Sequence, residues 1–207
     1  MISRLLRIIW IGPAISLMPA MAPISTHPAD AASIRLAQAK TNESSSNLPD
    51  VKLLIEQSGK LRSEGKFSEA TAIWRQLLAI AEEALGPNHP GVATSLNNLA
   101  LLLSDQGQYA LAEPLFRRSL AIRENTLGPD HPDVATSLNN LASLLSVQGQ
   151  YAAAESLSRR ALAIHEKAHG PDHPDIATSL NDLAVSLRYQ GQYAAAEPLF
   201  RRSLTIR

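Results

Sequence analysis

A block of 42 residues repeats along this chain and limits the possible folds more than any other feature. The segment GPNHP begins at Gly86, and GPDHP begins at Gly128 and again at Gly170, so successive starts lie 42 residues apart. Each start is followed by ATSLN and then by QGQY. A fixed period of this length is the sequence signature of a solenoid, in which each unit buries its apolar face only by stacking on its neighbours.

Each block contains two helical patterns separated by a glycine. In the third block, apolar residues recur at helical spacing from Asp133 to Val147. A second helical pattern runs from Tyr151 to about Ala168, and Gly149 lies between the two. Pro132 suits the first position of a helix, where a missing backbone N–H leaves no hydrogen bond unmade. One block therefore predicts a helix A, a tight turn, a helix B and a loop.

The residues that recur in these helices resemble a known family. The pattern L-x-x-L-A-x-x-L-x-x-x-G-x-Y-x-x-A-x-x-x-F resembles the tetratricopeptide repeat. In one block it consists of Leu96, Leu99, Ala100, Leu103, Gly107, Tyr109, Ala112 and Phe116. The block is longer than the usual unit of about 34 residues and is similar to the repeats of kinesin light chain and its bacterial relatives. This resemblance implies an all-α fold, a right-handed α-solenoid of tetratricopeptide-like helix pairs.

The resemblance covers Val51 to Arg207 and divides this domain into four units. Their bounds are about 51–86, 87–128, 129–170 and 171–207. The first unit is a degenerate copy, with Gln57 and Ser58 where the others have leucine and alanine. Terminal repeats are often atypical because one of their faces meets water, so we expect this unit to cap the stack.

The segment before the repeats has the features of an export signal. Residues 1–31 carry a basic start, an apolar stretch and a small-x-small cleavage pattern at Ala20-Met21-Ala22. Pro23 disfavours cleavage there, which makes Ala29-Asp30-Ala31 a second candidate site. Residues 32–50 are polar and are predicted to form a flexible linker. We expect an exported protein, periplasmic or secreted, and the alternative is an uncleaved N-terminus that anchors the chain in the inner membrane.

Composition excludes several functional classes. The formal net charge is +0, so nothing in the overall charge attracts nucleic acid. The chain has no cysteine and therefore no disulfide framework or thiolate nucleophile. No phosphate-binding glycine loop or nucleophile elbow is present. We expect no cofactor, no small-molecule substrate and no catalytic activity.

One segment matches the sequence of a metalloprotease motif. His165-Glu166-Lys167-Ala168-His169 fits H-E-x-x-H, which on a helix presents two imidazoles to zinc and a glutamate as general base. The same positions one period earlier read Arg123-Glu124-Asn125-Thr126-Leu127, which indicates drift at the end of a repeat helix. The repeat plan places His173 across a loop and so supplies no third ligand. The sequence predicts no metal site, and a zinc hydrolase remains as the alternative.

Two further recurring features have a structural interpretation. A histidine recurs in every GPxHP loop, at His89, His131 and His173, and is predicted to help to cap helix A. A pair of arginines recurs on helix B, one turn after a glutamate. The pairs are Arg117-Arg118, Arg159-Arg160 and Arg201-Arg202, after Glu113, Glu155 and Glu197. Helical i,i+4 ion pairs on a solvated face explain this pattern.

The polar stripe of the A helices is the best candidate for a binding site. In tetratricopeptide solenoids these helices line the concave surface, where extended peptides bind, so the resemblance implies a non-catalytic scaffold with a peptide or protein partner. An asparagine amide offers a donor and an acceptor to a peptide backbone. The predicted groove residues are Asn97, Asn98, Leu101, Asn139, Asn140, Ser143, Asn181, Asp182, Val185 and Arg188. The alternative is that the asparagines join neighbouring repeats.

The character of the groove favours a weakly charged partner. Arg188 is the only cation in the predicted groove, so the acidic peptides preferred by the cargo-binding relatives are not expected here. A peptide with leucine or aromatic anchors against Leu101 and Val185 fits better.

A second interpretation is self-assembly. The apolar residues of the last unit would lack a neighbouring repeat, so this face is a candidate contact between copies of the chain. These residues are Leu199, Phe200, Leu204 and Ile206.

Overall fold

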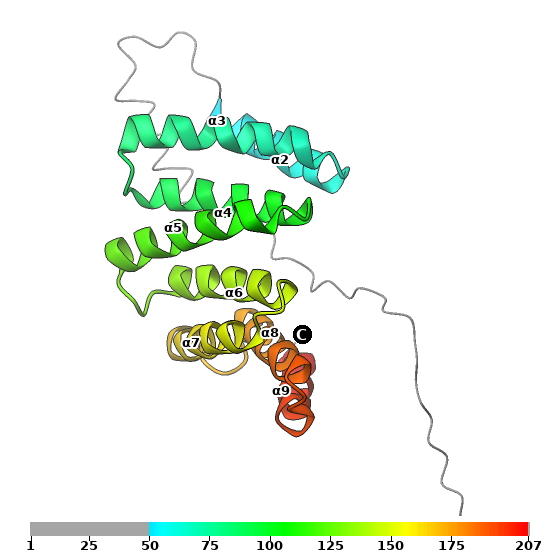
Figure 1. Cartoon of the computed structure of the whole chain (residues 1–207). Helices are drawn as coiled ribbons and strands as arrows, with labels where there is room; N and C mark the ends of the chain where they lie inside the picture. Colours follow the sequence, from blue (N-terminus) through cyan, green and yellow to red (C-terminus); the bar gives the residue numbers. More distant parts are fainter. Residues whose placement is uncertain (1–49, 207) are drawn as a thin grey trace, which may run out of the picture.

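The computed structural model describes residues 50–206, and within this range the chain is helical with no strand. The helices follow one another in four pairs, and each pair lies within the residue range of one of the four units (Figure 1). Their bounds are α2 Val51–Ser63, α3 Phe67–Leu85, α4 Pro90–Asp105, α5 Tyr109–Leu127, α6 Pro132–Val147, α7 Tyr151–His169, α8 Pro174–Tyr189 and α9 Tyr193–Ile206. The predicted α-solenoid is confirmed. The predicted signal peptide and all of the predicted linker except Asp50 lie outside the described residues.

Glycines and histidines set the ends of the helices as the sequence predicts. Gly149 ends the turn between α6 and α7 with φ 79°, a left-handed conformation that favours glycine. The Nδ1 atoms of His89 and His131 accept hydrogen bonds from the backbone N–H groups of Gly91 and Asp133, both at 3.1 Å. His173 caps α8 in the same way at 3.3 Å. The GPxHP loop therefore stops helix B and starts the next helix A.

Small residues let the two helices of a pair approach closely. Ala142 on α6 and Ala154 on α7 are completely buried, as are Ala100 and Ala112 in the preceding pair. The apolar cluster that contains them extends from α2 to α7, so the core continues from one pair to the next. Stability therefore depends mainly on contacts between neighbouring helices.

The A helices form one side of the stack. Each B helix packs against the A helix of the next pair, α3 on α4, α5 on α6 and α7 on α8. In addition, α4 contacts α6, and α6 contacts α8. Helices α4, α6 and α8 therefore lie side by side in one layer, to which the predicted groove residues belong.

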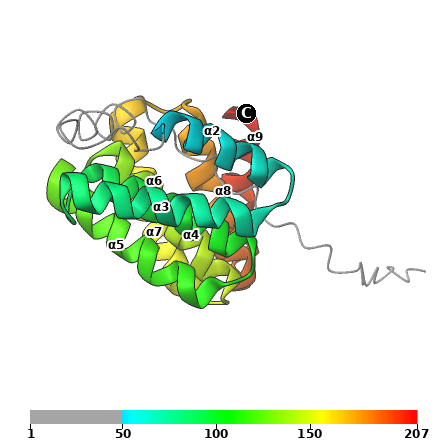
Figure 2. The ribbon, with the colours of Figure 1, turned by 90° about the horizontal axis from the view of Figure 1, so that it is seen from above.

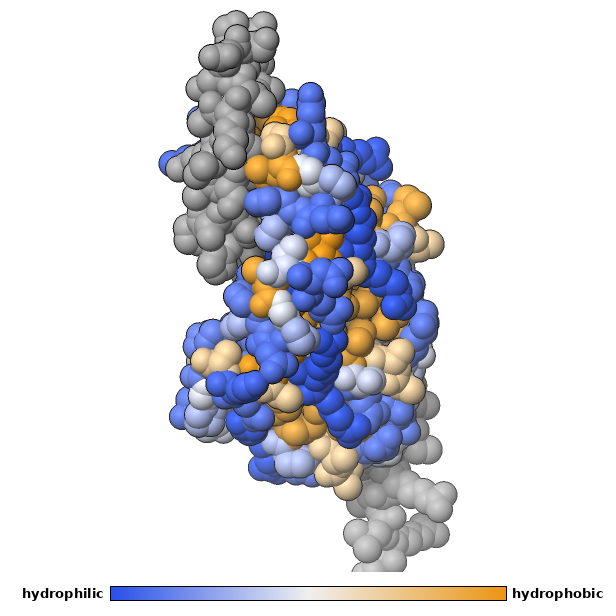
Figure 3. Space-filling model, turned by 90° about the vertical axis from the view of Figure 1, so that its left-hand side faces the viewer, coloured by the Kyte–Doolittle hydropathy of each residue, from blue (hydrophilic) through white to orange (hydrophobic). Residues whose placement is uncertain are grey.

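The stack twists along its length. Helices α3 to α6 run nearly parallel across Figure 1, whereas α8 and α9 are turned away from them, and the view along the stack shows the same rotation (Figure 2). Figure 3 shows one side of the stack, where hydrophilic residues surround small separate apolar patches. None of the described helices is long and apolar enough to span a membrane.

Candidate functional site

The ten residues predicted to line the groove lie on three successive A helices. Helix α4 carries Asn97, Asn98 and Leu101, α6 carries Asn139, Asn140 and Ser143, and α8 carries Asn181, Asp182, Val185 and Arg188. Because α6 contacts both α4 and α8, the fold brings the ten residues into one layer.

Most of these residues are buried in that layer. Six of the ten have at most 8% of their surface exposed: Asn97, Asn98, Leu101, Asn139, Asn140 and Asp182. Ser143, Asn181 and Val185 are partly exposed, and Arg188 is exposed. The accessible part of the predicted surface is therefore the strip on α6 and α8 formed by these last four residues, which we call the open strip.

Hydrogen bonds between A helices explain part of this burial. The Nδ2 of Asn140 donates to the Oδ1 of Asn97 at 2.8 Å, which joins α6 to α4. The Nδ2 of Asn139 donates to the Oγ of Ser179 at 2.8 Å, which joins α6 to α8. The sequence left two roles open for the asparagines, which are to bind a peptide in the groove and to join neighbouring repeats. At these three positions the side chains join neighbouring repeats.

Three of the predicted groove asparagines keep hydrogen-bonding atoms without a partner among the described residues. These atoms are the Nδ2 of Asn97, both side-chain polar atoms of Asn98 and the Oδ1 of Asn139. Folded proteins rarely leave buried amide groups unpaired, and each such group costs about 1–3 kcal/mol. These buried amide groups are therefore a local cost to the stability of the layer of A helices.

An aromatic pair at the end of the open strip was not anticipated from the sequence. Tyr189 on α8 stacks on Tyr151 of α7, with ring centroids 4.9 Å apart and planes 6° apart. The guanidinium of Arg188 lies 5.0 Å from the centre of the Tyr189 ring. Earlier units have Asp105 and Val147 at the position of Tyr189. The unusual aromatic residue in the last unit was therefore the sequence feature from which this aromatic pair could have been predicted.

The arginine pairs divide into two roles, and the prediction was wrong for the second arginine of each pair. The first arginine makes the expected i,i+4 ion pair, as Arg117 does with Glu113 at 2.9 Å. The second reaches back to the preceding unit. These contacts join Arg118 to Glu82, Arg160 to Glu124 and Arg202 to Glu166. A helix-surface pattern does not reveal them, because they depend on how consecutive B helices are placed.

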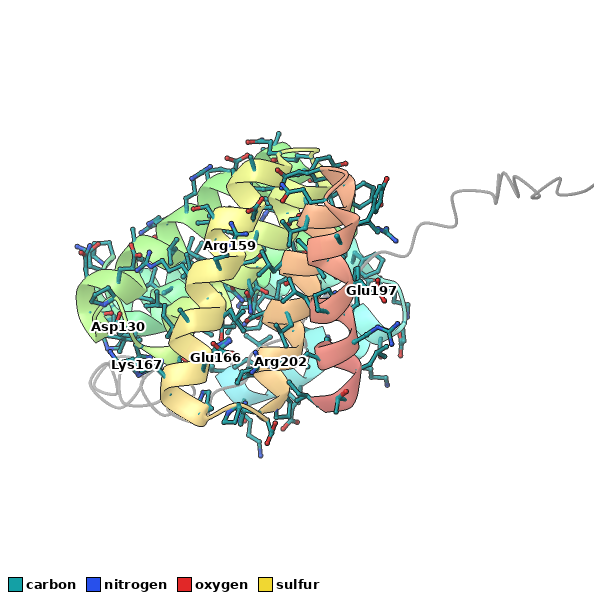
Figure 4. All side chains as sticks on the ribbon, turned by 90° about the horizontal axis from the view of Figure 1, so that it is seen from below. Asp130, Arg159, Glu166, Lys167, Glu197 and Arg202 are labelled. Atoms are coloured by element: carbon teal, nitrogen blue, oxygen red, sulfur yellow. The ribbon has the colours of Figure 1, made fainter. Side chains whose placement is uncertain are left out.

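Each second arginine also donates to a backbone carbonyl of the preceding loop. For Arg202 this acceptor is the oxygen of Pro171, at 3.3 Å. Figure 4 shows Arg202 on α9 beside Glu166 on α7. In the same region, Lys167 donates to the carboxylate of Asp130 at 2.7 Å. This hydrogen bond lowers the pKa of Asp130 and raises the pKa of Lys167.

The H-E-x-x-H segment does not have the geometry of a hydrolase centre. The carboxylate of Glu166 accepts a hydrogen bond from Arg202 at 2.6 Å, so it is held by a cation of the next unit. His165 is 2% exposed, and its Nδ1 lies 3.0 Å from the Oγ of Ser179. Burial lowers the pKa of His165. His169 lies at the exposed end of the helix, so the two imidazoles have different surroundings.

Sequence comparison identifies the repeats. The tetratricopeptide repeat profile matches residues 61–125, 94–158 and 133–207, which together make up more than half of the chain. The chain belongs to the tetratricopeptide repeat family. Tetratricopeptide repeats generally mediate protein–protein interaction or scaffolding. No curated protein sequence matches the chain significantly.

Solved structures place this tetratricopeptide chain among those with kinesin-light-chain-like repeats. The crystal structure of BtubC (BKLC) from P. vanneervenii is similar with a TM-score of 0.69 and 21% identity, over 84% of this chain and 73% of that one. The nearly identical TPR-like repeats of a kinesin-light-chain type protein from Podosopora anserina give a TM-score of 0.65 and 26% identity, over 83% of this chain and 82% of that one. The first similarity concerns the fold alone.

Proposed function

We propose that this protein is a non-catalytic scaffold that binds a peptide or protein partner along its layer of A helices. The observation that carries the proposal is the open strip, where Ser143, Asn181, Val185 and Arg188 remain accessible while the other six predicted groove residues are buried. A site that binds a chain segment needs contiguous side chains on rigid elements, and two neighbouring helices supply them here.

The chemistry of the strip indicates the kind of partner. Val185 offers an apolar contact, Asn181 offers an amide donor and acceptor, and Arg188 with Tyr189 forms a cationic and aromatic end. A single cation gives little attraction for a strongly acidic segment. The partner is therefore an extended segment with leucine or aromatic anchors and few charges, bound by apolar contact and by hydrogen bonds to its backbone.

Site-directed crosslinking tests this proposal, because the chain has no cysteine of its own. Ser143→Cys and Arg188→Cys place one thiol each on the open strip. Leu111→Cys is the matched control, since Leu111 is 56% exposed on the B helix α5. Each full-length variant is coupled to a photoactivatable crosslinker and incubated with an extract of the native host.

The expected result is a partner crosslinked from both strip positions and not from the control. Circular dichroism verifies that the three variants are equally helical. Crosslinking from Leu111→Cys alone, or equally from all three positions, would contradict binding along the A helices and would move the interface to the outer B-helix layer.

A further inference from the structure

Three metal-ligating side chains converge where α7 passes into α8. His169 is the last residue of α7, His173 is the N-cap of α8, and Asp175 lies in its first turn. The sequence places His173 across a loop from the H-E-x-x-H segment, and helical periodicity gives no distance between His173 and His169. The loop turns back so tightly that the two imidazoles stack with their centroids 4.2 Å apart.

The ligand atoms lie at distances close to those of a coordination sphere. One ligand atom from each of the three residues lies within 4.8 Å of the others. The Oδ2 of Asp175 is 3.4 Å from the Nδ1 of His173 and 4.0 Å from the Nε2 of His169. A tetrahedral ion with bonds of about 2.0–2.1 Å needs its ligand atoms about 3.3 Å apart. Rotation of the partly exposed His169 and Asp175 side chains shortens the distances between the ligand atoms to this value.

The weak cap on α8 is compatible with this role. The Nδ1 of His173 is 3.3 Å from the backbone N–H that it caps, against 3.1 Å for the same bond at His89 and His131. This nitrogen has one lone pair, so an ion bound to it replaces the cap hydrogen bond. Metal binding at His173 therefore replaces the longest of the three histidine cap hydrogen bonds.

The preceding loop provides an internal comparison. One period earlier, His131 and Asp133 hold the positions of His173 and Asp175, and their side chains lie 3.8 Å apart. The position of His169 is occupied by Leu127, which cannot ligate a metal. Among the described residues, the group at the α7–α8 loop is the one in which three such side chains meet.

We propose that His169, His173 and Asp175 bind one divalent transition-metal ion that ties α7 to α8. Two imidazoles and one carboxylate suit Zn²⁺, Co²⁺ or Ni²⁺, whereas Ca²⁺ and Mg²⁺ prefer all-oxygen sites. Water completes the coordination, because the three side chains are partly open to solvent. The ion is structural and stabilises the junction between the third and fourth helix pairs. This site is independent of the open strip.

Cobalt titration of the tag-free, full-length protein tests the site. Co²⁺ is the probe because its visible absorption reports nitrogen and oxygen coordination, and Zn²⁺ is then added to displace it. The expected result is one saturable Co²⁺ per chain, displaced by Zn²⁺, with a Zn²⁺-dependent rise in the melting temperature. His169→Leu reproduces the side chain of the preceding unit and should weaken binding by at least about tenfold.

Leu127→His is the converse variant and should create a second Co²⁺ site in the α5–α6 loop. Circular dichroism without metal verifies that both variants keep the helical content of the natural chain. Equal Co²⁺ affinity of the natural chain and His169→Leu would overturn the proposal, and so would the absence of saturable binding to the natural chain. The difference in Co²⁺ affinity between the natural chain and His169→Leu tests the metal site even if Leu127→His does not fold.

Discussion

At the residue scale, two buried serines differ in a single hydrogen bond. Ser158 on α7 and Ser119 on α5 are both 0% exposed. The hydroxyl of Ser119 donates to the carbonyl of Ala93 at 2.7 Å, whereas that of Ser158 has no partner among the described residues. Ser158 stands where the neighbouring units have phenylalanine, at Phe116 and Phe200.

We therefore expect alanine substitutions at these two serines to have opposite effects. Ser158→Ala removes an unpaired buried hydroxyl and should raise the free energy of unfolding by about 1 kcal/mol. Ser119→Ala removes the hydrogen bond that joins α5 to the carbonyl of Ala93 on α4 and should lower it by about 1 kcal/mol. Urea unfolding followed by circular dichroism measures both. A loss of similar size in the two variants would show that the hydroxyl of Ser158 is satisfied in solution.

His165 makes the stability of the third pair sensitive to acid. Burial lowers the pKa of its imidazole in the folded chain, whereas the unfolded chain keeps the ordinary value of about 6.5. Below this value the unfolded chain binds a proton that the folded chain resists, so the free energy of unfolding falls as the pH drops from about 6.5 towards the lowered pKa.

His165→Gln should reduce this dependence on pH, because glutamine can still bond to Ser179 but does not titrate. Melting temperatures of the two proteins at neutral pH and at a pH below about 6 measure the effect. An equal decrease in both proteins would assign the acid sensitivity to other groups.

At the element scale, the two arginines of one pair should contribute unequally. Arg159 pairs with Glu155 on its own helix, whereas Arg160 pairs with Glu124 of the preceding unit and donates to the carbonyl of Pro129 in the loop that follows that unit. Exposed i,i+4 pairs contribute about 0.3–0.5 kcal/mol. Arg160 joins two elements and makes two kinds of contact, so we expect Arg160→Gln to cost about 1 kcal/mol and Arg159→Gln less.

A double-mutant cycle between Arg160 and Glu124 isolates this contact. Urea unfolding of the two single variants and the double variant should give a coupling energy that decreases when salt is added, because both side chains are partly exposed. Equal costs for the two arginines, with no coupling to Glu124, would mean that the ion pair between units does not contribute to stability.

The helices themselves could be predicted from the sequence because their signals are local. The pattern from Asp133 to Val147 gave α6 to within one residue, and that from Tyr151 gave the start of α7. The histidine caps followed from the same local reasoning. The contacts between units could not be predicted in this way, because helical periodicity gives the face of a side chain and not the distance to the next helix.

The asparagines and histidines show the same limit at the candidate sites. Asn139 was predicted on the polar stripe of helix A, but its bond to Ser179 depends on the spacing of α6 and α8. His173 was known to follow His169 by one loop, but only the path of that loop brings the two rings together. Aligning the blocks detects a residue type that differs from the equivalent residues of the other units, such as Tyr189 or His169. The alignment does not show which residue that side chain contacts in the structure.

At the scale of the whole molecule, the repeating contacts imply that whole units are interchangeable. Each B helix packs on the next A helix through equivalent surfaces, α3 on α4 and α5 on α6. Residues 86–127 form one full period, and removing them joins Leu85 to Gly128. This junction has the same residue types as the natural Leu85-Gly86 and Leu127-Gly128 junctions, so α3 can meet α6 in place of α4.

Deletion of residues 86–127 should therefore leave a folded stack of three pairs. We expect a monomer with a similar helical signal per residue and a lower melting temperature, because one interface between neighbouring pairs is lost. Deletion of residues 86–108 is the matched control. It removes α4 and its turn but keeps α5, so two B helices follow each other with no A helix between them. That variant should aggregate or lose cooperative unfolding, as measured by gel filtration and circular dichroism. If both deletions unfold the protein alike, the stack is a single cooperative core and the nearest-neighbour description of its stability is wrong.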